Sequence, residues 1–138
     1  MVLVSHRYKF IFIKVNRTAS TTIESFLQKF CLSEEEEKNY KPTEFNETII
    51  NEYGIISTRD PKKNNKGLRG HISLAELKLK FKNNFKDYKV ITSIRNPFDM
   101  AVSSYEVNKS ISKKNISFSE GLKFFTDRKT NIQYFTKS

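Results

Sequence analysis

The hydrophobic positions along the chain form two kinds of pattern, continuous runs and stripes at helical spacing. Residues 8–15 and residues 88–94 are continuous runs of aromatic and β-branched side chains with few polar breaks. Such runs predict strands that are buried in a sheet. A third, shorter strand is predicted at residues 53–57.

Helices are predicted where apolar side chains recur every three or four residues. The first begins near Ile23, and Thr21 and Glu24 provide a capping box at its start. Ser73 and Glu76 provide a second capping box, ahead of a helix over residues 74–81. The apolar stripe of the first helix contains Ile23, Phe26, Leu27, Phe30 and Cys31.

Two more helices are predicted after the apolar run at 88–94. Pro97 suits the first turn of one, and Ser117 and Glu120 cap the other. The order strand, helix, helix, strand, helix, helix predicts a single α/β domain over residues 1–138, with parallel strands joined by helical crossovers. The apolar stripes of these two helices contain Phe98, Ala101, Val102 and Tyr105 in the first, and Phe118, Leu122 and Phe125 in the second.

Two polar segments separate the predicted elements. Residues 33–51 open with the acidic run 34–37, and we expect a loop with short helical turns whose glutamates form a solvated face. Residues 59–67 contain proline, glycine and two asparagines, and they predict a turn-rich loop.

Composition and charge narrow the possible kinds of site, the cellular location and the charge of the partner. The one cysteine, Cys31, excludes disulfides and a cysteine zinc site, and its place on an apolar stripe predicts a thiol packed in the core. The N-terminal apolar stretch is short and broken by Lys9 and Lys14, so it predicts neither a signal peptide nor a membrane span, and we expect a cytoplasmic protein. The net charge is +10, and residues 61–138 alone carry 17 basic and 6 acidic side chains. This field favours an anionic partner.

Both long apolar runs are followed by a short polar loop with an arginine and then by a helix. The first loop contains Arg17 and the hydroxyl or small side chains of residues 18–22, and the second contains Arg95, with Ser103 eight residues on. Ligands of open α/β sheets bind where strands end, and helix N-termini attract anions, so two neighbouring anion sites are predicted. The alternative at each place is a simple helix cap or a surface ion pair. A Walker loop is excluded, because the first segment has no glycine.

The sequences "FIFIKVNRTASTTIESFL" and "VITSIRNPFDMAVSSYE" resemble the two nucleotide motifs of sulfotransferases that use 3'-phosphoadenosine-5'-phosphosulfate (PAPS), in their carbohydrate-type and bacterial branch. The resemblance implies a P-loop-like three-layer sandwich, with a short parallel sheet flanked by helices. It also implies that Arg17, Thr18, Ala19, Ser20, Thr21 and Thr22 hold the 5'-phosphosulfate, and that Arg95 and Ser103 hold the 3'-phosphate.

The chain departs from the family pattern at three positions. Asn16 stands where the family has proline, Arg17 where it has lysine, and Met100 where it has a second arginine. Arginine at position 17 retains the charge but donates through a planar fork rather than a compact ammonium. Loss of the arginine at position 100 removes either a surface contact or a nucleotide contact, so affinity for the 3'-phosphate is the property that we expect to change first.

The expected reaction is in-line sulfuryl transfer from PAPS to a hydroxyl of a small-molecule or carbohydrate acceptor, without a metal. His71, in "LRGHISLAELK", is the predicted general base, by likeness to the family, and Arg17 is the predicted stabiliser of the leaving phosphate. His6 lies outside both motifs. Lys14 is either close to the site or a core-edge lysine whose head reaches solvent, and Glu24 is better explained by the capping box.

The sequence leaves the acceptor and several alternatives open. The chain is short, so the walls of the acceptor site are minimal or come from a second subunit of a homodimer. A basic nucleic-acid-binding module is disfavoured because the aromatic residues fall on core stripes, so no specific nucleic acid is expected, and no membrane partner either. A catalytically inactive nucleotide-binding protein of the same fold stays open, and a kinase is the weakest alternative.

Overall fold

The computed structural model describes residues 2–41, 48–58, 72–82, 85–112 and 116–121, and it divides the chain into two compact units. The first unit comprises residues 1–15 and 19–93, and the second comprises residues 16–18 and 94–138. The single domain expected over residues 1–138 stays a prediction. The turn-rich loop predicted at 59–67 lies outside the described residues.

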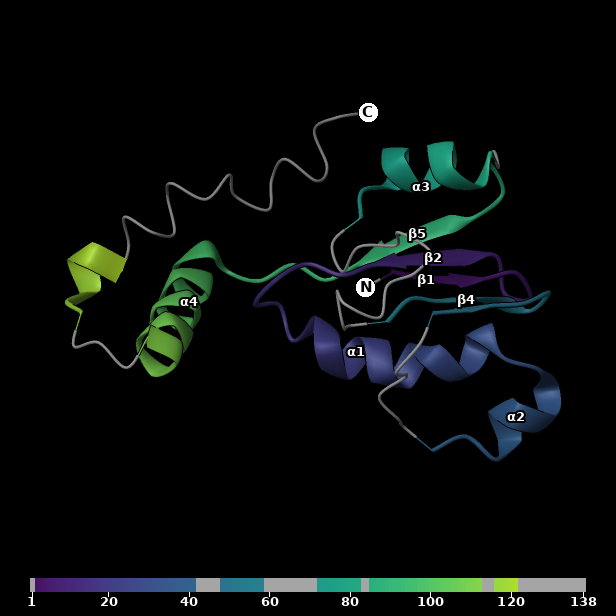
Figure 1. Cartoon of the computed structure of the whole chain (residues 1–138), viewed down its shortest axis with the longest axis horizontal. Helices are drawn as coiled ribbons and strands as arrows, with labels where there is room; N and C mark the ends of the chain where they lie inside the picture. Colours follow the sequence, from purple (N-terminus) through teal and green to yellow (C-terminus); the bar gives the residue numbers. More distant parts are fainter. Residues whose placement is uncertain (1, 42–47, 59–71, 83–84, 113–115, 122–138) are drawn as a thin grey trace. The chain divides into compact units, whose positions relative to one another are not determined.

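Five strands of the first unit form one mixed sheet in the order β3-β4-β1-β2-β5 (Figure 1). The pair β2–β5 is parallel, as expected for the two long apolar runs, and the other three pairs are antiparallel. The α/β class is confirmed, but the sheet has one parallel pair rather than parallel strands throughout. The strands are β1 (Val2–Ser5), β2 (Phe10–Ile13), β3 (Ile49–Ile50), β4 (Gly54–Ile56) and β5 (Lys89–Thr92).

The central strand β1 is not predicted by the hydrophobic pattern. Its residues pair with β2 across a tight turn, with Val2 opposite Ile13 and Ser5 opposite Phe10. Lys9 adopts φ 52 in this turn, which brings the chain back into the sheet. Four residues are too few to show a clear alternation, so the same apolar stretch that is too short for a membrane span becomes the middle of the sheet.

Side chains alternate between the two faces of the sheet, and each face has its own core. One face is covered by α3 (Leu74–Phe81), and its core contains Val2, Val4, Ile11, Ile13, Ile55, Ile72, Leu77 and Phe85. The other face is covered by α1 (Ser20–Leu27) and the short 3-10 helix η1 (Gln28–Cys31), and its core contains Leu3, Phe10, Phe12, Cys31, Leu32 and Ile56. Figure 1 shows α3 and α1 on opposite sides of the sheet, so the three-layer sandwich is confirmed.

The predicted places of Cys31 and α3 are confirmed. Cys31 is fully buried, and burial raises the pKa of its thiol to about 12. The capping box before α3 is formed as expected, because the Glu76 backbone N–H donates to Ser73 Oγ at 3.2 Å and the Ser73 backbone N–H donates to Glu76 Oε2 at 2.9 Å. A cap of this kind stabilises a helix by about 0.5–2 kcal/mol.

The first helix differs from its prediction in its cap, whereas most of its apolar stripe packs as expected. The capping box of Thr21 and Glu24 is wrong, since the N-cap is Ala19 and no side chain caps it. Cys31 belongs to the core on this face of the sheet, and the partly buried Ile23, Leu27 and Phe30 pack against that core. Phe26 is the exception, because it is 60% exposed. The residues of α1 and η1 that are buried beneath the sheet are Ser20, Glu24, Gln28 and Cys31.

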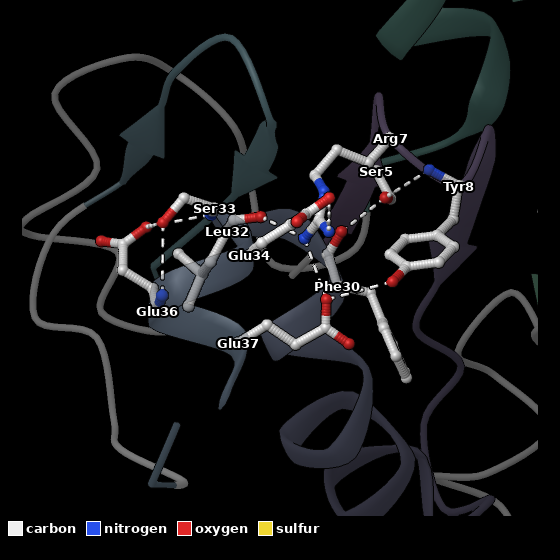
Figure 2. A network of polar contacts seen from close by, with 9 residues as sticks. All are labelled: Ser5, Arg7, Tyr8, Phe30, Leu32, Ser33, Glu34, Glu36 and Glu37. Atoms are coloured by element: carbon white, nitrogen blue, oxygen red, sulfur yellow. Dashed lines mark hydrogen bonds and ion pairs between the residues drawn. The ribbon is translucent and has the colours of Figure 1, made fainter. Parts of the chain in front are cut away.

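The acidic run forms α2 (Glu34–Lys38), and its prediction as a solvated face is correct only in part (Figure 2). The Glu34 side chain is 79% exposed, but that of Glu37 is only 20% exposed. Glu37 Oε2 accepts hydrogen bonds from Arg7 Nη1 at 2.9 Å and from Tyr8 Oη at 3.1 Å. The pattern could not show this, because Arg7 lies in the turn between β1 and β2, far from α2 in sequence.

The prediction that residues 88–94 form a buried strand is wrong about burial. β5 is the last strand of the sheet and pairs only with β2 in the observed order. Val90 is 46% exposed and Ile91 is 38% exposed, so neither side chain is in a core. The strand itself and its parallel pairing are correct, because β-branched composition predicts a strand without fixing how well its faces are covered.

The second unit contains the helix α4 (Pro97–Ser112), which begins where predicted. Ala101 is buried, whereas Phe98 and Val102 from the same expected stripe are 79% and 49% exposed. The last predicted cap is formed, since the Ser117 backbone N–H donates to Glu120 Oε2 at 2.8 Å. Residues 118–121 are helical, and the expected positions 122 and 125 lie outside the described residues.

Candidate anion-binding site

The chain leaves β2 through a turn with an unusual backbone. Arg17 has φ 63 and Ala19 has φ 55, both in the left-handed region. Residues other than glycine adopt this backbone conformation at a free-energy cost of about 1–3 kcal/mol each, so surrounding contacts must hold the turn in place. Left-handed residues in a short turn direct successive backbone N–H groups to one side, which is the geometry of known anion-binding turns.

Two side-chain contacts in the first unit fasten the ends of this turn. Ser20 Oγ donates to the Val15 carbonyl oxygen at 2.6 Å, and Lys14 Nζ lies 2.9 Å from Glu24 Oε2. Glu24 is fully buried, and the Lys14 side chain is 14% exposed. Glu24 is therefore not a capping residue, and the expectation that Lys14 extends its head into solvent is wrong.

The N-terminus of α1 follows the turn directly. Ala19 accepts the first helical hydrogen bond, from the Thr22 backbone N–H at 3.0 Å, and no side chain caps the helix. The first turn of α1 contains no acidic residue, and Thr21 and Thr22 are exposed. No side chain therefore caps the backbone N–H groups at this helix end, and no carboxylate in the first turn of α1 offsets the positive potential there.

Arg95 and Arg17, which are 78 residues apart in sequence, meet in the second unit. Arg95 Nη1 donates to the carbonyl oxygen of Arg17 at 3.4 Å. Both arginines are exposed, and within the described residues neither forms an ion pair with a carboxylate. The Arg95 guanidinium thus lies beside the backbone of Arg17, and two exposed arginines without a carboxylate partner in this part of the structure create a place where an anion is favoured.

The other predicted residues of the second unit lie on α4 or at its N-terminus. Asn96 caps this helix, since its Oδ1 accepts from the Phe98 backbone N–H at 2.9 Å. Ser103 lies on α4 and is half-buried, and so is Met100. The cap at Asn96 follows from the sequence Asn-Pro, in which asparagine precedes a proline at the first helical position.

The structure brings some of the predicted site residues together and leaves others untested. Arg17, buried Thr18 and Arg95 belong to the second unit, and residues 19–22 begin α1 in the first. The predicted base, His71, lies outside the described residues. The other histidine, His6, has its Nδ1 at 2.8 Å from Tyr88 Oη, and burial together with the nearby Lys9 lowers its pKa.

A separate pocket of about 520 Å³ lies beside the turn between β1 and β2. The Arg7 guanidinium in this pocket is already paired with both Glu34 and Glu37. It therefore offers a weaker attraction for an anion than the exposed arginines do. The pocket is lined by Arg7, Tyr8, Lys29, Glu34, Glu37 and Lys38.

Neither a metal centre nor a membrane-crossing helix is found in the described ranges. No group of three or more histidine, cysteine, aspartate or glutamate side chains there could hold a metal ion. None of the helices described is both long and apolar enough to cross a membrane.

Comparison with known proteins gives one match. A family model described as "Sulfotransferase domain" matches residues 55–138, which is more than half of the chain. The matched segment includes Arg95 and Ser103, whereas Arg17 and its turn precede it. No curated protein and no solved structure matches the chain.

Proposed function

Because the chain belongs to the sulfotransferase domain family, we propose that it transfers a sulfuryl group from PAPS to a hydroxyl of a small-molecule or carbohydrate acceptor. Members of the family catalyse sulfuryl transfer in general.

The observation that carries the proposal is the meeting of Arg17 and Arg95. The resemblance assigns them to opposite ends of one nucleotide, and a hydrogen bond of 3.4 Å joins Arg95 Nη1 to the Arg17 carbonyl, which supports the proposal. Both guanidinium groups are exposed, so both are accessible to phosphate or sulfate oxygens. Guanidinium groups match such oxygens through two parallel hydrogen bonds.

The residues present fit the donor. Arg17, the backbone of residues 18–22 and the exposed hydroxyls of Thr21 and Thr22 would hold the 5'-phosphosulfate, and Arg95 and Ser103 would hold the 3'-phosphate. The hydroxyl of Ser20 is already bound to the Val15 carbonyl. PAPS supplies the activated sulfuryl group. Arg17 would stabilise the negative charge that develops on the bridging oxygen as the bond between sulfur and that oxygen breaks. No metal is required for this charge stabilisation.

The proposed general base is His71. As the acceptor oxygen forms its bond to sulfur, the proton of the acceptor hydroxyl would pass to the neutral imidazole. An ordinary histidine pKa of about 6.5 leaves most of the imidazole neutral near pH 7, so it can accept a proton. This assignment rests on the family resemblance of the segment "LRGHISLAELK".

Thermal unfolding with three ligands tests the proposal. We expect 3'-phosphoadenosine-5'-phosphate, at about one hundred times its Kd, to stabilise the protein by about 2.7 kcal/mol and raise its Tm by about 10 °C. ATP and a single-stranded oligonucleotide serve as controls, and each should shift the Tm much less. A shift with the oligonucleotide alone would favour the nucleic-acid-binding alternative.

The methionine at position 100 favours a second candidate function, that of a nucleotide-binding protein without transfer activity. The family arginine is absent at this position, and the residue that replaces it is half-buried in α4. In that case the bisphosphorylated nucleotide would still raise the Tm, but radiolabelled sulfate would not pass from PAPS to any acceptor in a panel of phenols and glycans. Detectable transfer to any member of the panel excludes this candidate.

A further inference from the structure

The helices α1 and η1 contain a stripe of buried polar residues. Ser20, Glu24 and Gln28 follow one another at intervals of four, and each is almost fully buried. Residues at this spacing lie on one face of a helix. Apolar residues of the same two helices, Ile23, Leu27 and Phe30, pack against the sheet core as a surface helix ordinarily does, so burial of a polar stripe beside them calls for a separate explanation.

The charged centre of the stripe is the pair Lys14–Glu24. Lys14 Nζ lies 2.9 Å from Glu24 Oε2, and Gln28 Nε2 donates to the other carboxylate oxygen at 3.3 Å. Gln28 Oε1 in turn accepts from Tyr40 Oη at 2.5 Å. The carboxylate is thus held on both oxygens, and its orientation is fixed by neighbours that are themselves held.

Stability alone is a weak explanation for such a pair. Removing two charges from water is costly, and well-packed apolar residues of similar volume often replace a buried ion pair without loss of stability. Buried ionic groups are better attested where they select one arrangement among several. The question is therefore which arrangement this pair selects.

The position of the pair answers this question. Lys14 is the residue after β2 and stands two positions before Asn16, where the turn begins, and Glu24 lies one helical turn after Ser20. The pair therefore connects the two chain segments that enter and leave the turn, parallel to the contact of 2.6 Å between Ser20 Oγ and the Val15 carbonyl. The turn contains two left-handed residues, which need such external support.

We propose that Lys14 and Glu24 form a positioning pair that holds the turn of residues 16–19 in its anion-binding conformation. The pair acts through the turn, since fully buried Glu24 cannot itself reach a ligand. The inference rests on the proposed function only in naming the anion, which is the 5'-phosphosulfate end of the donor.

The first test measures the turn without any nucleotide. In the double variant Lys14→Met/Glu24→Leu, backbone order parameters of residues 15–20 should fall from about 0.85 to below about 0.6, while the strands keep their values. Arg7→Met is the matched control, because it removes the cation of another ion pair of 2.9 Å in the same unit. Unchanged order parameters in the folded double variant would overturn the inference.

The second test measures affinity for 3'-phosphoadenosine-5'-phosphate by calorimetry. Lys14→Met should raise the Kd at least about tenfold, and Lys14→Arg, which keeps a cation for Glu24, should restore most of the affinity. Arg7→Met should leave the Kd within about twofold of the wild type. Equal losses in Lys14→Met and Arg7→Met would mean a general structural effect and would contradict the inference.

The two tests separate this inference from the proposed function. If the wild-type protein does not bind the nucleotide, the proposed function fails, and the order parameters still decide whether the pair holds the turn. If the nucleotide binds but the turn is unchanged in the double variant, the proposed function stands and the inference fails.

Discussion

Replacement of Arg95 with alanine tests the proposal that Arg17 and Arg95 bind opposite ends of the same nucleotide. Arg95 is exposed, and its hydrogen bond to the Arg17 carbonyl is long, at 3.4 Å. The variant should therefore change the free energy of unfolding by less than about 0.5 kcal/mol. In the complex, Arg95 would donate charge-assisted hydrogen bonds to the 3'-phosphate, and losing one of these costs about 1.5–3 kcal/mol. The Kd should rise about 10- to 100-fold.

The assay compares two nucleotides by titration calorimetry. 3'-Phosphoadenosine-5'-phosphate carries the 3'-phosphate, and adenosine 5'-phosphosulfate does not. Arg95→Ala should weaken only the first, whereas Arg17→Ala should weaken both. Lys80→Ala, in an exposed position of α3, is the control for net charge and should leave both affinities unchanged within about twofold. Equal weakening of the two nucleotides by Arg95→Ala would refute the assignment of Arg95 to the 3'-phosphate.

Three further predictions concern the base, the pH dependence and the core. His71→Ala should lower the rate of sulfuryl transfer by about 10²- to 10⁴-fold in a radiolabel assay, with nucleotide affinity unchanged by calorimetry; an unchanged rate would remove the assignment. Burial lowers the pKa of His6, so the unfolded chain takes up the proton first, and stability should be full above about pH 6.5 and decline as the pH falls through the lowered value. Urea unfolding across this range should show the decline in the wild type but not in His6→Gln. Leu77→Ala, at a fully buried position, should cost about 2–5 kcal/mol in urea unfolding, whereas Leu79→Ala, at a side chain that is 79% exposed, should cost less than about 0.5 kcal/mol.

Local signals predicted the elements that have strong caps or long apolar runs. The helix at 74–81 was predictable to the residue because Ser73 and Glu76 form their cap from neighbouring atoms alone. β2 and β5 were predictable as a parallel pair because each precedes a helix. β1 was not predictable, because a segment of four residues forms a strand here through its pairing with β2 and β4. The hydrophobic pattern does not show that pairing.

The candidate site was predictable in its arginines but not in its supports. Arg17 and Arg95 stand out because each follows an apolar run and precedes a helix. Glu24 fits a capping box by spacing, yet the left-handed backbone of Ala19 changes the helix start and turns the carboxylate toward Lys14. The Glu24 carboxylate could either cap the helix or pair with Lys14, ten residues away. Tertiary packing decides between these two partners, and the sequence pattern shows only the local cap.

The order of the strands has a consequence for synthesis on the ribosome. Strand β1 pairs with β2 at once, but its other neighbour, β4, follows about fifty residues later, and β5 reaches β2 later still. Until residue 56 has emerged, the nascent hairpin has two open edges and apolar side chains on both faces, and the edge of β2 stays open until residue 92 has emerged. Pairing over such separations is slow, and open edges recruit other chains. Expression at low temperature, or with a chaperone that covers the hairpin, should therefore raise the yield of folded protein.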